Sequence, residues 1–309
     1  MKRFSILFVL LVSLLATGFA SDLNFTGDVR VRHEVIDDST TTQNTRQRVR
    51  ARLYAETQVS DETTVGLGLV TGSADRRSTN QTLGGTFTSK GVNLDTAFIE
   101  TKVLGADVLL GKFKNPLVTQ SELFWDSDVR PEGVAVTYPW KSLTLGGAYL
   151  VTEDNATNDG ALALGQVSYS NELFEASASY TASVNLATKG RYIGVNGAWS
   201  KPVLGLTPFV EYVTNTEATT DDTAWLVGVK TSFKGVGVKY AYRNVEANAV
   251  NALLTDSDFG NGVDAKGSEL NLSYQFKQAK LGVTYFDLTN GLTTGTDYDR
   301  LQVDLAVKF

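Results

Sequence analysis

The chain contains no cysteine and only one histidine, His33. Without cysteine it can form neither a disulfide framework nor a thiolate metal site. A single histidine cannot form a multi-histidine metal site, and any Ser-His-Asp triad would have to use His33. These two absences argue against an enzyme, and we expect no metal or other cofactor.

Long apolar runs are also missing from nearly all of the chain. The one extended run follows Lys2 and Arg3 and ends at a small-residue cleavage site, which is the pattern of an export signal. It is shorter than the roughly 18 residues that a spanning helix needs. We therefore predict a signal peptide at 1–20, cleaved after Ala20, and one domain at 21–309. That domain can reside in a membrane only as a closed barrel of strands.

Positive charge is scarce as well. The signal holds two of the 28 basic residues and none of the 34 acidic ones, so the exported chain has 26 basic residues and a net charge of −8. This charge argues against nucleic acid or anionic lipid as the main partner. Mean hydropathy is near zero, at −0.10. In a membrane protein such a value is expected only where apolar and polar faces alternate.

Alternation is what most of the chain contains. In the segment 298–309, Leu301, Val303 and Leu305 alternate with polar residues, so a strand there has one apolar and one polar face. The length suits one barrel of roughly 16 strands, each of about 9–11 residues. We predict strands at 23–34, 46–59, 63–71, 92–103, 106–112, 132–138, 142–152, 161–169, 173–183, 190–200, 204–214, 223–233, 235–246, 267–277, 279–288 and 298–309.

Short and long connections follow one another along the chain. Tight connections such as 60–62 and 104–105 alternate with longer polar stretches, which predicts short periplasmic turns and long outer loops. One segment is irregular: in 92–103, Asp95 and Glu100 have opposite parity, although both are expected to face the lumen. This indicates either a β-bulge or a contact between subunits.

Six arginines recur at every second position of two neighbouring segments: Arg30 and Arg32 in the first, and Arg46, Arg48, Arg50 and Arg52 in the second. They cannot face lipid, where each would cost about 2–4 kcal/mol near the midplane, so we expect them on the lumen wall. Asp28, Glu34 and Glu56 share that face and offset part of the repulsion. Two interpretations remain open: a positive stripe that acts on permeating solutes, or a wall neutralised by acids without a role in selection.

The long stretch 113–131 is too apolar for a solvated loop. It contains Leu117, Val118, Leu123, Phe124 and Trp125, which predicts that this third long loop folds into the barrel. In that position four acids are expected to lie in the lumen opposite the arginines: Glu122, Asp126, Asp128 and the nearby Glu132. The acidic loop opposite the basic wall would then produce an electric field across the narrow opening of the pore. The alternative is a loop packed at a subunit interface or over the barrel mouth.

A weaker signal is a group of acids late in the chain. Asp256, Asp258 and Asp264 lie near Gly260 and Gly262 and loosely suggest calcium binding. They lack the spacing of a calcium loop, and a solvated outer loop is the expected structure.

Several short motifs make the chain similar to a known family. They are Gly27–Arg30, Thr71–Ser73, Ser78–Leu83, Gly111–Lys112, Lys114–Pro116, Trp125–Asp128 and Pro131–Gly133. Together they resemble the bacterial putative-porin family over about residues 27–138. The resemblance implies a water-filled outer-membrane pore. The general porins, which have a similar architecture, use an inward third loop as their constriction and usually assemble as trimers.

We therefore expect an all-β, transmembrane antiparallel barrel in the bacterial outer membrane. It would pass small hydrophilic solutes and ions by diffusion, through a constriction formed by the arginines and the loop acids. The arginine patch is the densest lumen charge and favours a weak preference for anions. The expected partners are outer-membrane lipid, permeating solutes and two further copies of the chain. The rival hypothesis is a structural or adhesive barrel with a plugged lumen, which would use 72–91 and 247–266 as binding surfaces.

Overall fold

The computed structural model of the protein describes residues 23–39, 43–155, 158–186 and 189–309. The predicted signal peptide lies outside the described residues. Within them, all regular secondary structure is β-strand. No helix in this part of the chain is long and apolar enough to cross a membrane.

Sixteen of the strands are long and one, β4, has only two residues. Their bounds are β1 (Asn24–Asp38), β2 (Asn44–Ser60), β3 (Thr63–Thr71), β4 (Gln81–Thr82), β5 (Val92–Val103), β6 (Ala106–Lys112), β7 (Glu132–Trp140), β8 (Leu143–Asn155), β9 (Asn158–Ser170), β10 (Phe174–Val184), β11 (Arg191–Trp199), β12 (Thr207–Asn215), β13 (Thr223–Phe233), β14 (Val236–Val245), β15 (Ala265–Phe276), β16 (Ala279–Asn290) and β17 (Thr296–Lys308).

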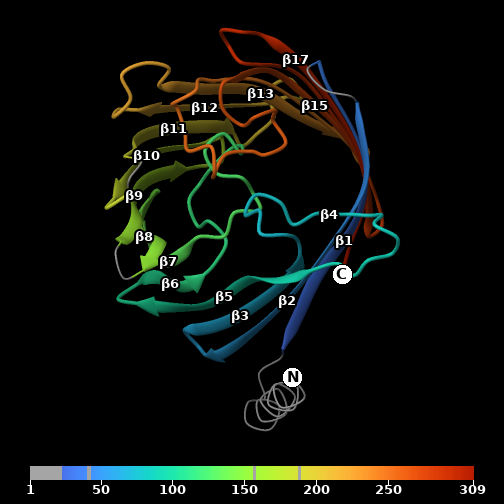
Figure 1. Cartoon of the computed structure of the whole chain (residues 1–309). Coiled ribbons are helices and arrows are strands. Elements are labelled where there is room, and N and C mark those ends of the chain that lie inside the picture. Colours follow the sequence, from blue (N-terminus) through green and yellow to red (C-terminus); the bar gives the residue numbers. More distant parts are fainter. Residues whose placement is uncertain (1–22, 40–42, 156–157, 187–188) are drawn as a thin grey trace.

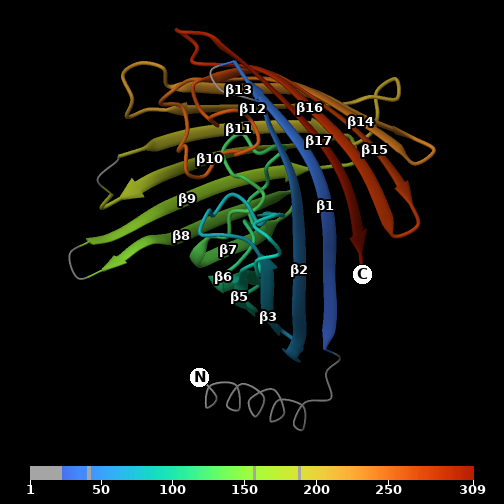
Figure 2. The same cartoon turned by 45° about the vertical axis from the view of Figure 1, so that its right-hand side comes forward.

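The sixteen long strands form one closed antiparallel barrel (Figures 1 and 2). Each strand pairs with the next along the chain, and β17 pairs with β1 to close the ring. The predicted fold class and strand number are confirmed, and the predicted strands agree with the observed ones to within a few residues. The short β4, which pairs with β2, was not predicted.

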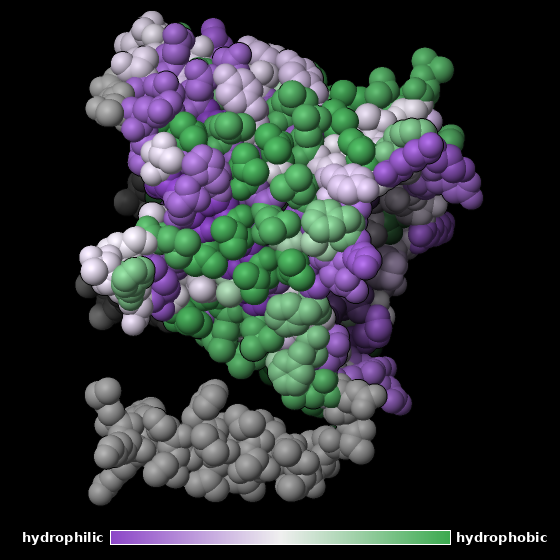
Figure 3. Space-filling view, turned by 90° about the vertical axis from the view of Figure 1, so that its right-hand side faces the viewer, coloured by the Kyte–Doolittle hydropathy of each residue, from purple (hydrophilic) through white to green (hydrophobic). Residues whose placement is uncertain are grey.

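Side-chain alternation explains why these segments form barrel strands. On β17, Leu305 and Val307 are 46% and 42% exposed on the outer surface, whereas Arg300 and Gln302 are buried inside. Figure 3 shows the result on one side of the barrel, where hydrophobic residues cover much of the wall and hydrophilic residues gather at its edges. An apolar outer wall around a polar interior is the arrangement that a lipid bilayer requires.

Two-residue turns join several strand pairs at one end of the barrel. Leu104 and Gly105 both have positive φ angles, 52° and 84°, and Lys234 and Gly235 have 47° and 83°. Positive φ at both central residues matches the right-handed twist of the flanking strands. Tight turns at this end leave the long loops at the other, as the alternation of connection lengths predicts.

The irregular segment contains a β-bulge. Gly68 pairs with Thr96 and the next residue, Leu69, pairs with Leu94, so Asp95 is the extra residue on β5. The bulge explains the opposite parity of Asp95 and Glu100. It turns the Asp95 carboxylate into the barrel, where it accepts hydrogen bonds from the Tyr54 hydroxyl at 2.7 Å and from Arg130 Nε at 3.0 Å.

The apolar core lies inside the barrel, between its inner wall and two inserted loops. Loop 113–131 and loop 246–264 enter the ring of strands (Figure 1, green and orange). One buried cluster joins Leu123 and Phe259 of these loops to Phe209 and Leu226 of the wall. The other includes Trp125 and Leu254 of the loops together with residues of β7 to β9. Apolar burial therefore holds both loops in the lumen.

Candidate functional site

The arginines of β1 and β2 form one patch of the lumen wall. In the register of the two strands, Arg30 lies opposite Arg50 and Arg32 opposite Arg48. The intervening Val29 and Val31 are 42% and 48% exposed on the outer surface. All six ladder arginines therefore share the inner face, and Arg300 of β17 joins them from the other side of β1. We call these seven residues the arginine wall.

Carboxylates approach every member of the arginine wall. Arg50 and Arg52 share Asp28 at 2.9 and 2.7 Å. Glu34, which is fully buried, pairs with Arg46 and also lies 3.7 Å from Arg48. The remaining contacts join Arg30 and Arg32 to Asp304, Arg32 and Arg300 to Asp258, Arg32 and Arg300 to Glu34, and Arg52 to Asp128.

This pairing compensates most of the wall but not all of it. Among the described residues, the seven arginines lie within 4 Å of five carboxylates: Asp28, Glu34, Asp128, Asp258 and Asp304. Two positive charges are therefore in excess. Arg30 and Arg48 are the least compensated members, because each reaches a carboxylate only at 3.7 Å and leaves a buried Nε without an acceptor.

Loop 113–131 crosses the lumen to the far wall. The Val118 backbone N–H donates to Gln166 Oε1 at 2.8 Å, and Gln166 Nε2 donates back to the Val118 carbonyl at 2.9 Å. Farther along, the backbone N–H of Ser121 donates to Glu211 at 2.9 Å. Gln166 lies on β9 and Glu211 on β12, so the loop is fastened to strands distant from the arginine wall.

Loop 246–264 also lies in the lumen, and this corrects an expectation from the sequence. Asp256 and Asp258 were expected in a solvated outer loop, but Asp256 is buried. Two backbone hydrogen bonds join this loop to the other one: Asp126 N–H to the Leu254 carbonyl at 2.6 Å, and Asp256 N–H to the Glu122 carbonyl at 3.2 Å. The physical reason is apolar content, since Leu254 and Phe259 need burial as much as the apolar residues of loop 113–131 do.

A third loop, 72–91, completes the contact between the inserted loops and the wall. Arg77 Nη1 donates to the Ala252 carbonyl at 2.7 Å. The backbone and hydroxyl of Thr79 both donate to Asp128 at 3.0 Å. Asn80 accepts a hydrogen bond from Arg30 at 2.6 Å. The arginine wall is thus linked to loop 113–131 through Asn80, Thr79 and Asp128 in turn.

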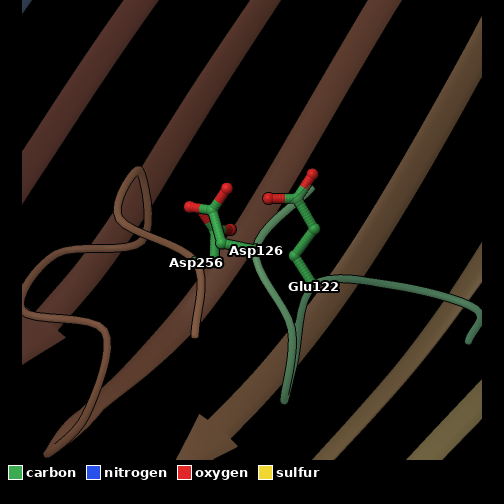
Figure 4. A group of neighbouring side chains, drawn as sticks. All are labelled: Glu122, Asp126 and Asp256. Carbon is green, nitrogen blue, oxygen red and sulfur yellow. The ribbon is translucent and has the colours of Figure 1, made fainter. Parts of the chain in front are cut away.

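Three carboxyl groups meet where the two inserted loops touch. Figure 4 shows Glu122 and Asp126 on one loop and Asp256 on the other, with their carboxyl groups turned to the same side. Their oxygens lie within 4.8 Å of one another. Carboxylates at such spacing are ligands that a hard divalent cation prefers. Arg243, 2.9 Å from Asp256, already supplies positive charge to the group.

The environment of these carboxyl groups favours their protonated forms. Burial raises the pKa of Glu122 well above its ordinary value, and the nearby Asp256 and Asp126 raise it further. Burial also raises the pKa of Asp126 to about 7, although the backbone N–H groups of Asp128 and Ser257 donate to it. Burial raises the pKa of Asp256 as well, against the opposing effect of Arg243. The acidic side of the lumen therefore carries less negative charge near neutral pH than its composition suggests.

A cavity of about 390 Å³ separates the two sides. It is lined by Arg30, Arg32 and Arg50 of the wall and by Glu122 and Asp126 of loop 113–131, and also by Asp304, which pairs with Arg32, and Arg243, which pairs with Asp256. A second cavity, of about 310 Å³, is bordered by Glu122, Asp126 and Arg52. Loop 113–131 thus lies between two open spaces of the lumen, and a solute in the first meets both the arginines of the wall and the carboxyl groups of the loop.

The predicted site residues are not all brought together. Of the loop acids, Asp128 reaches the wall, 3.6 Å from Arg52, whereas Glu122 and Asp126 lie beside Asp256 of the other inserted loop. Glu132 differs from the expectation, because it is the first residue of β7 and its side chain is 61% exposed. It pairs with Lys112 at 2.6 Å rather than with an arginine of the wall. The reason is strand parity, since Glu132 follows the outward face that Val136 and Tyr138 continue.

Sequence reasoning missed the residues that closure of the barrel brings to the site. Arg300, Gln302 and Asp304 belong to the polar face of the last strand, but nothing in that segment alone assigns them to the constriction. Pairing of β17 with β1 places Asp304 opposite Arg32. The closed topology itself was the available signal, because the first and last strands of a barrel must be neighbours.

The closed sixteen-stranded barrel with a charged lumen and inserted loops defines the class of porin-type outer-membrane barrels. The chain belongs to the family described as "Putative porin", whose family model matches residues 30–231. Family and fold together support the conclusion that the protein is a porin channel of the bacterial outer membrane rather than an enzyme.

Solved porin structures are similar over nearly the whole chain. A structure of Salmonella typhi OmpF in complex with daunomycin matches with 15% identity and a TM-score of 0.67, over 94% of this chain and 98% of that chain. A triple mutant of the Rhodopseudomonas blastica porin matches with 15% identity and a TM-score of 0.62, over 93% of this chain and 100% of that chain. At this identity the likeness concerns the fold. No curated protein matched the chain.

Proposed function

We propose that the barrel lets small hydrophilic solutes and ions diffuse passively across the outer membrane, with a weak preference for anions. The proposed constriction consists of the ladder arginines and the acids of loop 113–131. The observation that carries the proposal is the 390 Å³ lumen cavity, which is lined by Arg30, Arg32 and Arg50 of the wall and by Glu122 and Asp126 of loop 113–131.

The preference for anions is supported by the charges on the two sides. The arginine wall keeps two positive charges in excess of its neighbouring carboxylates. The opposing carboxyl groups of Glu122 and Asp126 have raised pKa values, which reduces their negative charge near neutral pH. An anion that passes the cavity therefore meets a net attraction, which the low dielectric of the barrel interior strengthens.

We further propose a homotrimer whose subunits meet through β2, β3, β5 and β6. Among the described residues, these strands expose large aliphatic side chains such as Leu67 and Ile99 but no aromatic one, whereas every strand from β10 to β16 exposes an aromatic side chain. Aromatic residues belong at the two lipid interfaces of a barrel. A sector without them is suited to contact with protein, and one such sector on each copy can close a ring.

Single-channel recording of the refolded protein in a planar bilayer tests the proposal. Steady ohmic steps would support an open pore, the sign of the reversal potential under a salt gradient would give the ion preference, and steps in threes would support the trimer. Silence from a correctly folded barrel would reject it in favour of a structural or adhesive barrel with a plugged lumen.

A further inference from the structure

The carboxylate of Asp258 lies among three donors of the barrel wall. Its Oδ1 accepts a hydrogen bond from Arg300 Nη2 at 2.7 Å. Its Oδ2 accepts from Arg32 Nη1 at 3.2 Å and from Gln302 Nε2 at 3.0 Å. Asp258 belongs to loop 246–264, whereas the donors come from β1 and β17. The loop thus presents a carboxylate to the wall much as a bound solute would.

The three donors are held in place without Asp258. Arg300 Nε donates to Glu34 at 3.1 Å, and Gln302 Nε2 lies 3.2 Å from the same carboxylate. Arg32 donates to both oxygens of Asp304, at 2.7 and 2.8 Å. The two guanidinium side chains are only 4% and 6% exposed. Donors fixed by other partners form a preorganised site for an oxyanion.

Asp258 itself is accessible from the lumen. Its side chain is 30% exposed, and it borders the 390 Å³ cavity. The loop that carries it has independent anchors, since Phe259 is 1% exposed and Leu254 is buried beside Trp125. Rotation of the Asp258 side chain toward the cavity would therefore free the donors without removing the loop from the lumen.

We propose that Arg32, Arg300 and Gln302 form a binding site for the carboxylate groups of permeating solutes, which Asp258 occupies as a built-in ligand. A solute carboxylate enters from the cavity, takes the three hydrogen bonds, and releases Asp258 toward the lumen. The arrangement makes binding weak and reversible, because the solute must compete with a tethered carboxylate at high effective concentration. This inference rests on the proposed pore function and names a substrate class for it: small carboxylates.

The test measures block of single-channel current by succinate in a chloride background. We expect Asp258→Asn to lower the half-blocking concentration about tenfold relative to the unmodified protein, the size of effect that one charge-assisted hydrogen bond supplies. The matched control is Asp264→Asn, which removes a carboxylate of the same loop that does not border the cavity and instead accepts a hydrogen bond from the Leu292 backbone N–H at 2.9 Å. The control should behave like the unmodified protein. Block of the current by succinamide, the neutral analogue, should be the same in the unmodified protein and in both variants.

A second variant tests the donors themselves. Adding Gln302→Ala to Asp258→Asn should reverse much of the gain in succinate block, since one of the three donors is lost. The inference is overturned if Asp258→Asn leaves the half-blocking concentration unchanged, if Asp264→Asn lowers it equally, or if succinamide blocks as well as succinate. In those cases ohmic steps of the unmodified protein would still support the pore. Absence of any steps would reject the proposed function instead.

Discussion

Asp304 of β17 holds Arg32 of β1 in a two-pronged hydrogen-bonded pair, although 272 residues separate them in the sequence. The two residues are direct partners in the register that closes the barrel. The planar guanidinium matches the two carboxylate oxygens, which fixes its orientation. Its third nitrogen, Nη1, is consequently directed to Asp258.

Loss of this pair should change the selectivity of the pore. We expect Asp304→Asn to shift the reversal potential under a salt gradient toward stronger anion preference, because the excess charge of the arginine wall rises by one. Asp304→Glu keeps the charge and serves as the control. An unchanged potential in Asp304→Asn would mean that the wall lies off the conduction path.

The ladder arginines should control the sign of the selectivity. Replacing Arg48 and Arg50 together with Glu turns the excess positive charge of the wall into a negative one, so the reversal potential should move to cation preference. Lys277→Glu, at an exposed turn after β15, makes a similar substitution away from the lumen and should leave the potential nearly unchanged. Equal shifts in both proteins would contradict a constriction at the arginine wall.

The preference for anions should strengthen as the pH falls. Asp126 has a pKa of about 7, so its carboxyl group takes up a proton between about pH 8 and pH 5 and loses its negative charge. Burial and the nearby Asp256 and Asp126 raise the pKa of Glu122 in the same direction. Reversal potentials measured across this range should show the trend. A double variant, Glu122→Gln with Asp126→Asn, should flatten it; a persistent trend would assign the pH dependence to other groups.

The same carboxyl groups link stability to pH. Their pKa values are higher in the folded state than in the unfolded chain, so the folded protein binds more protons. Their effect on stability is most favourable below the unfolded value, 3.8 for Asp126, and is lost as the pH rises through about 7. Thermal unfolding of the Glu122→Gln, Asp126→Asn protein should therefore depend less on pH over this interval than that of the unmodified protein.

The position of loop 246–264 in the lumen should depend on one buried aromatic side chain, that of Phe259. Phe259 is 1% exposed, and the Arg243 guanidinium lies 3.9 Å from its ring centroid. We expect Phe259→Ala to destabilise the protein by about 3–5 kcal/mol and to increase current noise as the loop loosens. Leu253→Ala removes a side chain of the same loop that is 54% exposed and should change neither property. Quiet channels and an unaltered melting temperature in Phe259→Ala would show that the loop is held by its hydrogen bonds alone.

The absence of cysteine makes the proposed subunit interface easy to examine. Leu67→Cys places a thiol on the outer face of β3, where a short bifunctional reagent should link copies of the chain. Tyr212→Cys, on β12 at the opposite side of the barrel, is the control; both native side chains are at least 40% exposed. Cross-linking that is equal at the two positions would argue against an interface at β2 to β6.

Strand positions were predictable because the alternation of polar and apolar residues is a local property. The sixteen-strand barrel, the shared face of the ladder arginines and the irregularity at Asp95 all follow from parity along single segments. Loop 246–264 was misjudged for a different reason. Its Leu254 and Phe259 are few and scattered among polar residues, whereas loop 113–131 concentrates its apolar side chains near Trp125.

Contacts between distant segments were not predictable from local patterns. The pairing of Asp258 with Arg300 depends on how far a loop reaches across the lumen, which neither its length nor its composition fixes. The raised pKa of Asp126 arises from burial against a second loop. Both properties belong to the closed barrel and not to any one segment of it.

The pairing of β17 with β1 also has a consequence for the order of folding. Until that last pairing forms, Glu34 lacks Arg300 and Arg32 lacks Asp304, so a nearly finished barrel has charged side chains without these partners at its open seam. Joining the ends of so long a chain carries a large entropic cost. Pairing of β17 with β1 offsets this entropic cost, because it forms a ladder of backbone hydrogen bonds and the ion pairs of Arg300 with Glu34 and of Arg32 with Asp304 in the same step. An incomplete barrel is therefore electrostatically distinct from a finished one, which favours late, all-or-none closure.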